Sequence, residues 1–268
     1  MIKADLHIHS RISDGSDTIE ELAVQAAEKG LDVIAVTDHD TLSQVRLISD
    51  ALPVRVIPGI EISCFDDAAN QRVHILGYQI QNITLVEEFV HPLLIARHEN
   101  ACKQIEILQK AGFSIDLTQL HRADGKYIYK QHIMEHLVKT GQVQEMFGDF
   151  YQRTFRNGGI CAFDITYLNP YEAVRIIRQA GGLAVLAHSG QQQNFGLIPQ
   201  LVQVGLTGLE CNHPAHQEAD KTIIREYANR YHLFLTGGSD YHGRYEKEVH
   251  ELGCCLSEES GVKAICCE

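Results

Sequence analysis

Residues 31–37 read LDVIAVT, a short and almost wholly apolar run that ends against Asp38, His39 and Asp40. A run of this length and composition is typical of a strand buried on both faces of a parallel sheet. Residues 17–30 precede it with apolar side chains at helical spacing, acids near the start and a terminal glycine. These are the start and stop signals of a helix. A helix that leads into a buried strand predicts an α/β fold with parallel strands.

The same rhythm covers most of the chain. Alternating or apolar runs predict further strands at residues 2–9, 54–57, 73–76, 183–187, 206–211 and 232–237. Helical spacing predicts further helices at 171–180, 197–204 and 219–231. Between 85 and 155 the pattern is helical and more polar. We therefore predict one α/β barrel, built from residues 1–84 and 156–268, with residues 85–155 as a helical insertion; a barrel of this length is ordinary for a single domain.

Composition indicates a soluble protein in a reducing compartment. Of the 268 residues, 44% are hydrophobic and 22% are charged, which is typical of globular proteins. No stretch approaches the ~20 apolar residues of a membrane span, and no signal-peptide layout is present. The eight cysteines show no CxxC spacing. We expect a cytoplasmic protein with reduced thiols and no membrane partner.

The net charge restricts the class of substrate. A formal charge of −12 argues against a broad basic face that wraps a nucleic-acid duplex. Bound divalent ions would still place positive charge where a substrate binds. The expected partner is therefore a small phosphorylated molecule or the end of an RNA.

Histidines and acids gather where the predicted strands end. The chain has fifteen histidines, and at period two His7 and His9 project to the same face of the first strand. Functional side chains of parallel α/β folds collect at the carboxyl ends of strands. Polar residues at or beside strand ends are His7, His9, His39, Glu61, His74, His188, Asp240 and His242. Imidazole with carboxylate is the ligand set of zinc, manganese or iron, so an open centre with several metal ions is expected.

Several motifs together resemble one known family. They are DLHIHS at 5–10, Asp14-Gly15, TDHDT at 37–41, PGIEIS at 58–63, HILG at 74–77, Ala187-His188 and GSDYH at 238–242. In order and rough spacing they are similar to the PHP (polymerase and histidinol phosphatase) family along nearly the whole chain. The segment Gly208-Leu209-Glu210 looks closest to stand-alone members, among them nucleoside 3′,5′-bisphosphate phosphatases and 5′-to-3′ exoribonucleases.

The resemblance implies a distorted (β/α)7 barrel with two or three divalent ions (Mn, Fe or Zn) at its carboxyl-end mouth. It implies a central ion on His7, His9, Glu61 and Asp240, a second on Glu61, His74 and His132, and a third on Asp14, His39 and His242. The sequence departs from the family before His132, where Lys130-Gln131 stands in place of the usual Arg-Pro. An arginine that holds substrate phosphate is therefore missing, and Lys130 offers only a point charge.

Other side chains have expected roles around the metals. His188 is the candidate for protonating the leaving oxygen or holding phosphate, with metal binding as the alternative. Lys130, Arg156 and His216 are candidate substrate contacts. Asp38 and Asp40 flank His39 and are expected to orient it. Cys64 and His213 are interpreted as structural.

The predicted activity is hydrolysis of phosphate esters by a metal-bridged hydroxide. Small nucleotides such as nucleoside 3′,5′-bisphosphates, or RNA 5′ ends, are the leading substrates. Three alternatives stay open: a phosphatase or cyclic phosphodiesterase for a non-nucleotide metabolite such as histidinol phosphate, an inactive PHP module that binds a partner, and a structural zinc site. The last would require four closed ligands.

Overall fold

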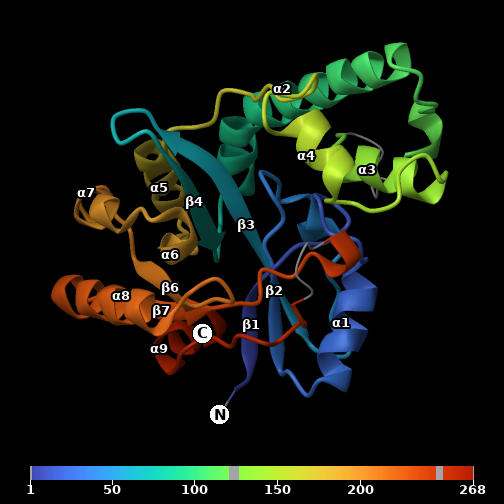
Figure 1. Cartoon of the computed structure of the whole chain (residues 1–268). Helices are drawn as coiled ribbons and strands as arrows, with labels where there is room; N and C mark the ends of the chain where they lie inside the picture. Colours follow the sequence, from blue (N-terminus) through green and yellow to red (C-terminus); the bar gives the residue numbers. More distant parts are fainter. Residues whose placement is uncertain (1, 121–126, 246–249, 268) are drawn as a thin grey trace.

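The computed structural model describes residues 2–120, 127–245 and 250–267, and its centre is a nearly closed barrel (Figure 1). Seven strands lie side by side in chain order: β1 (Ala4–Ile8), β2 (Val33–Val36), β3 (Arg55–Asp66), β4 (Gln71–Tyr78), β5 (Leu183–Leu186), β6 (Gly208–Asn212) and β7 (Phe234–Gly237). The segment after β7 approaches β1, because the Asp240 N–H donates to the His7 carbonyl and the His9 N–H to that of Tyr241, both at 2.9 Å. The predicted distorted seven-stranded α/β barrel is confirmed.

Strand β4 is where the barrel departs from a purely parallel one. It pairs antiparallel with both β3 and β5, whereas the other neighbouring strands pair parallel. A tight turn between Asp66 and Gln71 joins β3 to β4, and no crossover helix intervenes. Antiparallel strands need only such a turn. The hairpin places His74 opposite Ser63, two residues from Glu61 along β3.

Helices cover the outside of the barrel. They are α1 (Ile19–Glu28), α5 (Pro170–Gln179), α6 (Ser189–Gln192), α7 (Ile198–Gln203), α8 (Glu218–Tyr231) and α9 (Glu259–Cys266), with 3-10 turns η1 (Ser43–Arg46), η3 (Phe195–Leu197) and η4 (Gly243–Tyr245). Helix α1 begins at a capping box in which the Thr18 hydroxyl accepts from the Glu21 N–H and so satisfies a free N–H of the first turn. Helix α9 packs Val262 and Ile265 against barrel residues such as Leu6, away from the end that carries the histidines.

The middle of the chain forms a layer of helices with a core of its own. It holds α2 (Ile83–Lys110), η2 (Leu117–Gln119), α3 (Lys130–Lys139) and α4 (Asp149–Phe155), at the upper right of Figure 1. Ile105, Leu108, Met134 and Leu137 are buried together with Tyr151 in one cluster. Apolar burial of this kind stabilises the layer. The division of the chain at 85 and 155 stays a prediction.

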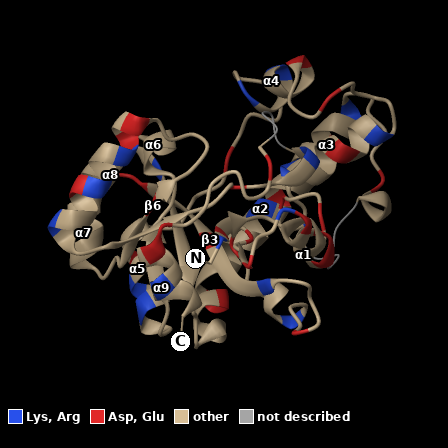
Figure 2. Cartoon of the chain, turned by 90° about the horizontal axis from the view of Figure 1, so that it is seen from below, with Lys and Arg blue, Asp and Glu red and all other residues tan. Residues whose placement is uncertain are grey.

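The surface carries mixed charge. Lys and Arg are interspersed with Asp and Glu over helices α3 and α8 in the view of Figure 2. Within the described ranges, no helix combines the length and the apolar composition that crossing a bilayer requires.

Candidate metal centre

Imidazole and carboxylate side chains on or just after five strands, β1, β2, β3, β4 and β7, converge at the mouth of the barrel. Their ligand atoms fall into three groups, each within 4.8 Å: His7, His9, Glu61 and Asp240; His9, Asp14, His39 and His242; and His39, Glu61 and His74. His7, His9, Asp14 and Glu61 are buried, and the other four side chains are partly exposed. The predicted ligands other than His132 are all among them, so residues as distant in sequence as His7 and Asp240 meet in one site.

The first group has the dimensions of a metal site. His7 Nε2 lies 3.3 Å from His9 Nε2 and from Glu61 Oε2, and 3.4 Å from Asp240 Oδ1. His9 Nε2 lies 3.1 Å from Glu61 Oε2 and 3.2 Å from Asp240 Oδ1. A tetrahedron with metal–ligand bonds of ~2.0–2.2 Å has edges of about 3.3–3.6 Å. The donor set and its spacing therefore fit a divalent ion among these four atoms.

Hydrogen bonds on the far side of two rings leave Nε2 available. Nδ1 of His242 lies 2.7 Å from the carbonyl oxygen of Asp240, which only accepts, so Nδ1 carries the proton. Nδ1 of His7 lies 3.0 Å from Oε1 of Glu210 and donates in the same way. The Nε2 lone pairs of both rings then face the carboxylates, and such a fixed tautomer is typical of ligating histidines.

The pKa shifts show how strongly the carboxylates and imidazoles of the site interact. Burial alone raises the pKa of Glu61, but His74, His39 and His7 outweigh it and hold the pKa well below its ordinary value. Burial also opposes the shift at Asp14, whose pKa His39, His242 and His9 lower to about 2. Burial lowers the pKa of His9, yet the carboxylates raise it to about 10. The two carboxylates thus favour their ionised forms, while burial lowers the pKa of His39 to about 4.

A histidine other than the predicted one lies beside Glu61 and His74. His188 Nε2 lies 2.8 Å from Glu61 Oε1, and His74 Nδ1 lies 2.8 Å from the same oxygen. Neither His132 nor His188 belongs to the three groups formed by described residues, and the His132 Nδ1 accepts from the Tyr129 N–H at 3.1 Å. The Nδ1 atom of His132 therefore faces the N-terminus of helix α3, and its role as a metal ligand stays a prediction.

The family is decided by a match over most of the chain. The family described as "PHP domain" matches residues 5–229. The chain belongs to the PHP family. Its metal-dependent enzymes hydrolyse phosphoesters, and this chain is a phosphoester hydrolase whose His, Asp and Glu clusters are able to bind metal.

Three similar proteins extend the comparison of this PHP enzyme. A phosphoribosyl 1,2-cyclic phosphate 1,2-diphosphodiesterase of Eggerthella lenta is 41% identical over 253 residues, which cover 92% of this chain and 96% of that protein. A 3′,5′-nucleoside bisphosphate phosphatase of Chromobacterium violaceum is 29% identical and covers 90% and 88%. The crystal structure of a Bifidobacterium adolescentis protein assigned as a metal-dependent phosphoesterase has a TM-score of 0.86 at 26% identity, over 98% and 95% of the two chains.

Two residues with other expected roles are held by contacts that the sequence did not indicate in this PHP site. Nδ1 of His216 lies 2.8 Å from the Cys211 carbonyl and its Nε2 accepts from the Gly190 N–H at 3.1 Å. Both ring nitrogens are therefore held by backbone, and the expected contact of His216 with substrate stays a prediction. Asp38, which was expected to orient His39, instead accepts from the hydroxyls of Ser10 and Ser13 and holds the loop after β1.

Sequence reasoning missed two buried residues beside the PHP ligands. Glu210 contacts the His7 ring, and the pKa of Glu210 falls to about 2 because His7 outweighs burial. His213 was interpreted as structural, yet its Nε2 lies 3.3 Å from Asp240 Oδ2. Each stands on or just after β6, and no paired ligand motif in the sequence signals either of them.

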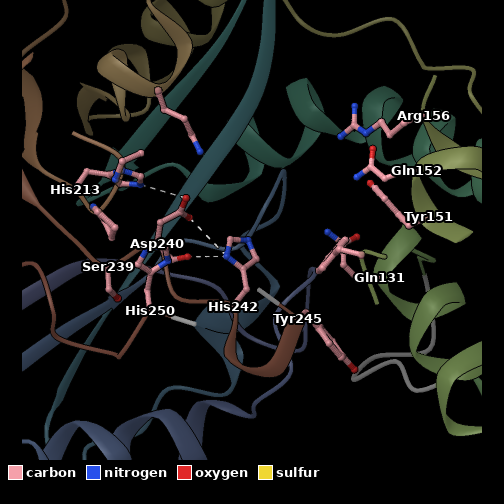
Figure 3. A pocket seen from close by; sticks show the side chains of 14 residues that line it. Gln131, Tyr151, Gln152, Arg156, His213, Ser239, Asp240, His242, Tyr245 and His250 are labelled. Atoms are coloured by element: carbon pink, nitrogen blue, oxygen red, sulfur yellow. Dashed lines mark hydrogen bonds and ion pairs between the residues drawn. The ribbon is translucent and has the colours of Figure 1, made fainter. Parts of the chain in front are cut away.

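Two cavities open beside the metal ligands. The larger one has about 590 Å³ and is lined by Asp240, His242 and His213 on one side, with Tyr151 and Arg156 across from them (Figure 3). The smaller one has about 180 Å³. Its lining includes the ligands Asp14, His39 and His74 and the cations Arg72, Arg97, Lys130 and Arg156. Because helices α3 and α4 supply residues to both, the inserted helices form one wall of the site.

Proposed function

We propose that this PHP enzyme opens a small cyclic phosphodiester on a sugar phosphate, with phosphoribosyl 1,2-cyclic phosphate as the leading substrate. The observation that carries the proposal is the 41% identity to the Eggerthella lenta diphosphodiesterase over 96% of that protein. Small nucleotides, which lead on sequence patterns alone, become the second candidate, since the Chromobacterium violaceum phosphatase is 29% identical.

The proposed ligands form two or three ion sites. The central ion takes His7, His9, Glu61 and Asp240, the second takes Glu61, His74 and His188, and the third takes Asp14, His39 and His242. Nitrogen and oxygen donors of this kind suit Mn, Fe or Zn. When bound, such ions polarise the phosphoryl oxygens and supply a nucleophile at neutral pH. A cytoplasmic location is part of the proposal.

The smaller cavity suits a second phosphate on the substrate. Arg97 is paired with Asp40, and Arg72 with Asp164. No ion pair within the described ranges joins Lys130 or Arg156 to a carboxylate. Burial and the nearby Arg156 both lower the pKa of Lys130. A bound anion would offset both effects and stabilise the charged form of Lys130.

This arrangement assigns work to the chain's own residues. Lys130 and Arg156 would hold the phosphate that is not cleaved, while the phosphoester lies against the histidines and Glu61. The bound phosphate fixes the distance between the sugar and the reacting centre. Translational and rotational entropy is then lost on binding and not in the chemical step, which lowers the activation barrier.

One observation favours nucleotides as the second candidate. The larger cavity is lined by Phe147, Tyr151 and Tyr245 as well as by metal ligands. Aromatic rings of this kind stack on bases at ~1–3 kcal/mol per base. A nucleoside 3′,5′-bisphosphate or an RNA 5′ end would place its base there.

The experiment compares substrates on one enzyme preparation. Protein stripped of metal and reloaded with Mn²⁺ is assayed by phosphorus NMR with phosphoribosyl 1,2-cyclic phosphate, adenosine 3′,5′-bisphosphate and a short 5′-phosphorylated RNA. We expect kcat/KM for the cyclic phosphate to exceed the others by at least ~10-fold, which is about 1.4 kcal/mol of transition-state binding. Loss of turnover in a double variant, His7→Asn with His9→Asn, ties it to the centre. If the cyclic phosphate stays unhydrolysed while phosphate is released rapidly from adenosine 3′,5′-bisphosphate, the substrate is a nucleotide.

A further inference from the structure

Strand β6 contributes no side chain to the three ligand groups of the described residues, although it runs between two strands that do lead to ligands. Two residues on and after it, Glu210 and His213, instead contact ligands from behind. We propose that they are positioning residues that set the affinity of the central ion by fixing His7 and Asp240. The inference rests on the proposed ligands but not on the identity of the substrate.

Glu210 holds two ligand-bearing segments at once. Its Oε1 lies 3.0 Å from His7 Nδ1, and its Oε2 accepts from the His188 N–H at 2.8 Å. Both oxygens are therefore used, and the residue is fully buried. Because a carboxylate only accepts, the His7 proton stays on Nδ1 and the Nε2 lone pair faces Glu61 and Asp240.

The second bond of Glu210 acts at a strained position. The backbone of His188 has a φ of 22°, in a region that side-chain-bearing residues rarely adopt, and such strain persists only where neighbouring groups impose it. The Glu210 carboxylate binds the His188 N–H at this point. Through its two oxygens, Glu210 thereby connects the carboxyl ends of β1 and β5.

His213 fixes the other ligand. Its Nδ1 accepts from the Ala215 N–H at 3.1 Å, so the ring proton resides on Nε2. Nε2 donates to Asp240 Oδ2 at 3.3 Å, a bond drawn in Figure 3. Oδ1 of Asp240 is left at 3.4 Å from His7 Nε2 and 3.2 Å from His9 Nε2. The His213 bond to Oδ2 therefore fixes the orientation in which Oδ1 faces these two rings.

Two other roles for His213 make different predictions. The ring lines the larger cavity, so it is also placed to contact substrate directly. Alternatively, it fills space only, since it is buried against His188 and His216. A glutamine at 213 preserves an N–H donor near the Nε2 position, whereas a leucine preserves volume alone, and this pair separates the three roles.

The test measures Mn²⁺ affinity by competition with a chelator, with metal content by elemental analysis, in the absence of any substrate. Glu210→Gln replaces one acceptor by an amide donor that faces the His188 N–H. We expect it, and His213→Leu, to weaken the central site by about 10–100-fold, while His213→Gln stays within about 3-fold of wild type. Glu218→Gln on the exposed face of α8 and His91→Gln on α2 are matched controls and should leave affinity unchanged.

Wild-type affinity in both Glu210→Gln and His213→Leu would overturn the proposal. Wild-type metal binding in His213→Gln together with a kcat reduced more than ~100-fold would instead make His213 a substrate contact. Thermal unfolding of each metal-free variant checks folding, and the His213 pair carries the test alone if Glu210→Gln does not fold. Since the affinity measurements use no substrate, a wrong choice of substrate in the proposed function leaves the metal-binding outcomes intact.

Discussion

His188 Nε2 and His74 Nδ1 both lie 2.8 Å from Oε1 of Glu61, and the proposed function assigns both histidines to the ion that Glu61 holds. We predict that His188→Ala lowers the bound metal by about one ion per chain and reduces kcat/KM by more than ~100-fold, because Glu61 loses a ligand that shares its ion. Elemental analysis of dialysed protein, alongside steady-state kinetics, measures both quantities.

His132→Ala is the comparison for that variant. We predict unchanged metal content, since the described part of the structure does not bring His132 into any ligand group, with only the stability change expected from losing its bond to the Tyr129 N–H. Loss of one ion from His132→Ala, with full occupancy in His188→Ala, would restore the assignment that the family resemblance implies.

Metal removal should abolish activity without unfolding the protein. The ligands reside on strands whose positions are maintained by extensive apolar cores, for example around Ile60, Ile75 and Leu209, so the barrel does not need the ions to hold its shape. We predict native far-UV circular dichroism after chelation, a lower Tm because bound ions stabilise the folded state, and recovery of turnover on adding Mn²⁺. Cooperative unfolding on chelation would indicate a structural zinc site.

The unpaired cations of the smaller cavity make a prediction about specificity. Lys130→Met and Arg156→Gln should each raise KM for a substrate with a second phosphate by about 10–100-fold, since each removes a charged contact to an anion. Turnover of bis(p-nitrophenyl) phosphate, which has no second phosphate, should change by less than ~3-fold. Steady-state kinetics on both substrates provides the measurement.

Lys110→Met is the control for these cation variants. Lys110 is exposed at the end of α2 and does not line the smaller cavity, so its loss removes a charge without removing a contact. Equal effects of Lys110→Met and Lys130→Met on KM would reduce the effect of Lys130 to long-range electrostatics and refute the subsite.

The barrel and most of the candidate metal ligands can be predicted from sequence patterns for an identifiable reason. Alternation in β1 puts His7 and His9 on one face, and strand ends of a barrel must converge, so ligands far apart in sequence are predictable together. The direction of β4 was not predictable, because a buried apolar run reads alike in parallel and antiparallel sheets. Nor was the role of His213, which depends on the approach of β6 to Asp240 after β7.

The choice between His132 and His188 shows the same limit. His132 lies in the first turn of α3 and His188 follows β5, and either imidazole could bind a metal ion. Only the geometry of Glu61, whose Oε1 faces the β5 end at 2.8 Å, separates them. Spacing along the chain does not determine which ring reaches a given carboxylate.

Gly238 should be irreplaceable because it lies against the backbone of a ligand. A methyl group at Gly238 would overlap the N, Cα and Cβ atoms of His7, and the β1 backbone has little room to shift. We predict that Gly238→Ala lowers the free energy of unfolding of metal-free protein by about 1–3 kcal/mol and weakens Mn²⁺ binding at His7. Gly196→Ala, where nothing lies within 4 Å, is the control. Equal stability of the two variants in urea unfolding would refute this packing argument.

Glu135 should make folding stability depend on pH. This buried carboxylate on α3 pairs with Lys139 and with Arg244 beyond the barrel, and although burial opposes it, hydrogen bonds from Lys139, Tyr245 and Arg244 lower the pKa of Glu135 from 4.5 to about 2. A lowered pKa means that the folded state favours the ionised form, so the stabilisation is present above pH ~4.5 and is lost as the pH falls towards 2.

Because both cations are about half exposed and screened by water, we expect Glu135→Gln to cost about 1–2 kcal/mol at pH 6. In urea unfolding of metal-free protein, the difference from wild type should shrink between pH 5 and pH 3. Glu106→Gln, an exposed acid on α2, should show no such trend, and a constant difference for Glu135→Gln across this range would show that its contacts stabilise the fold through packing and not through charge.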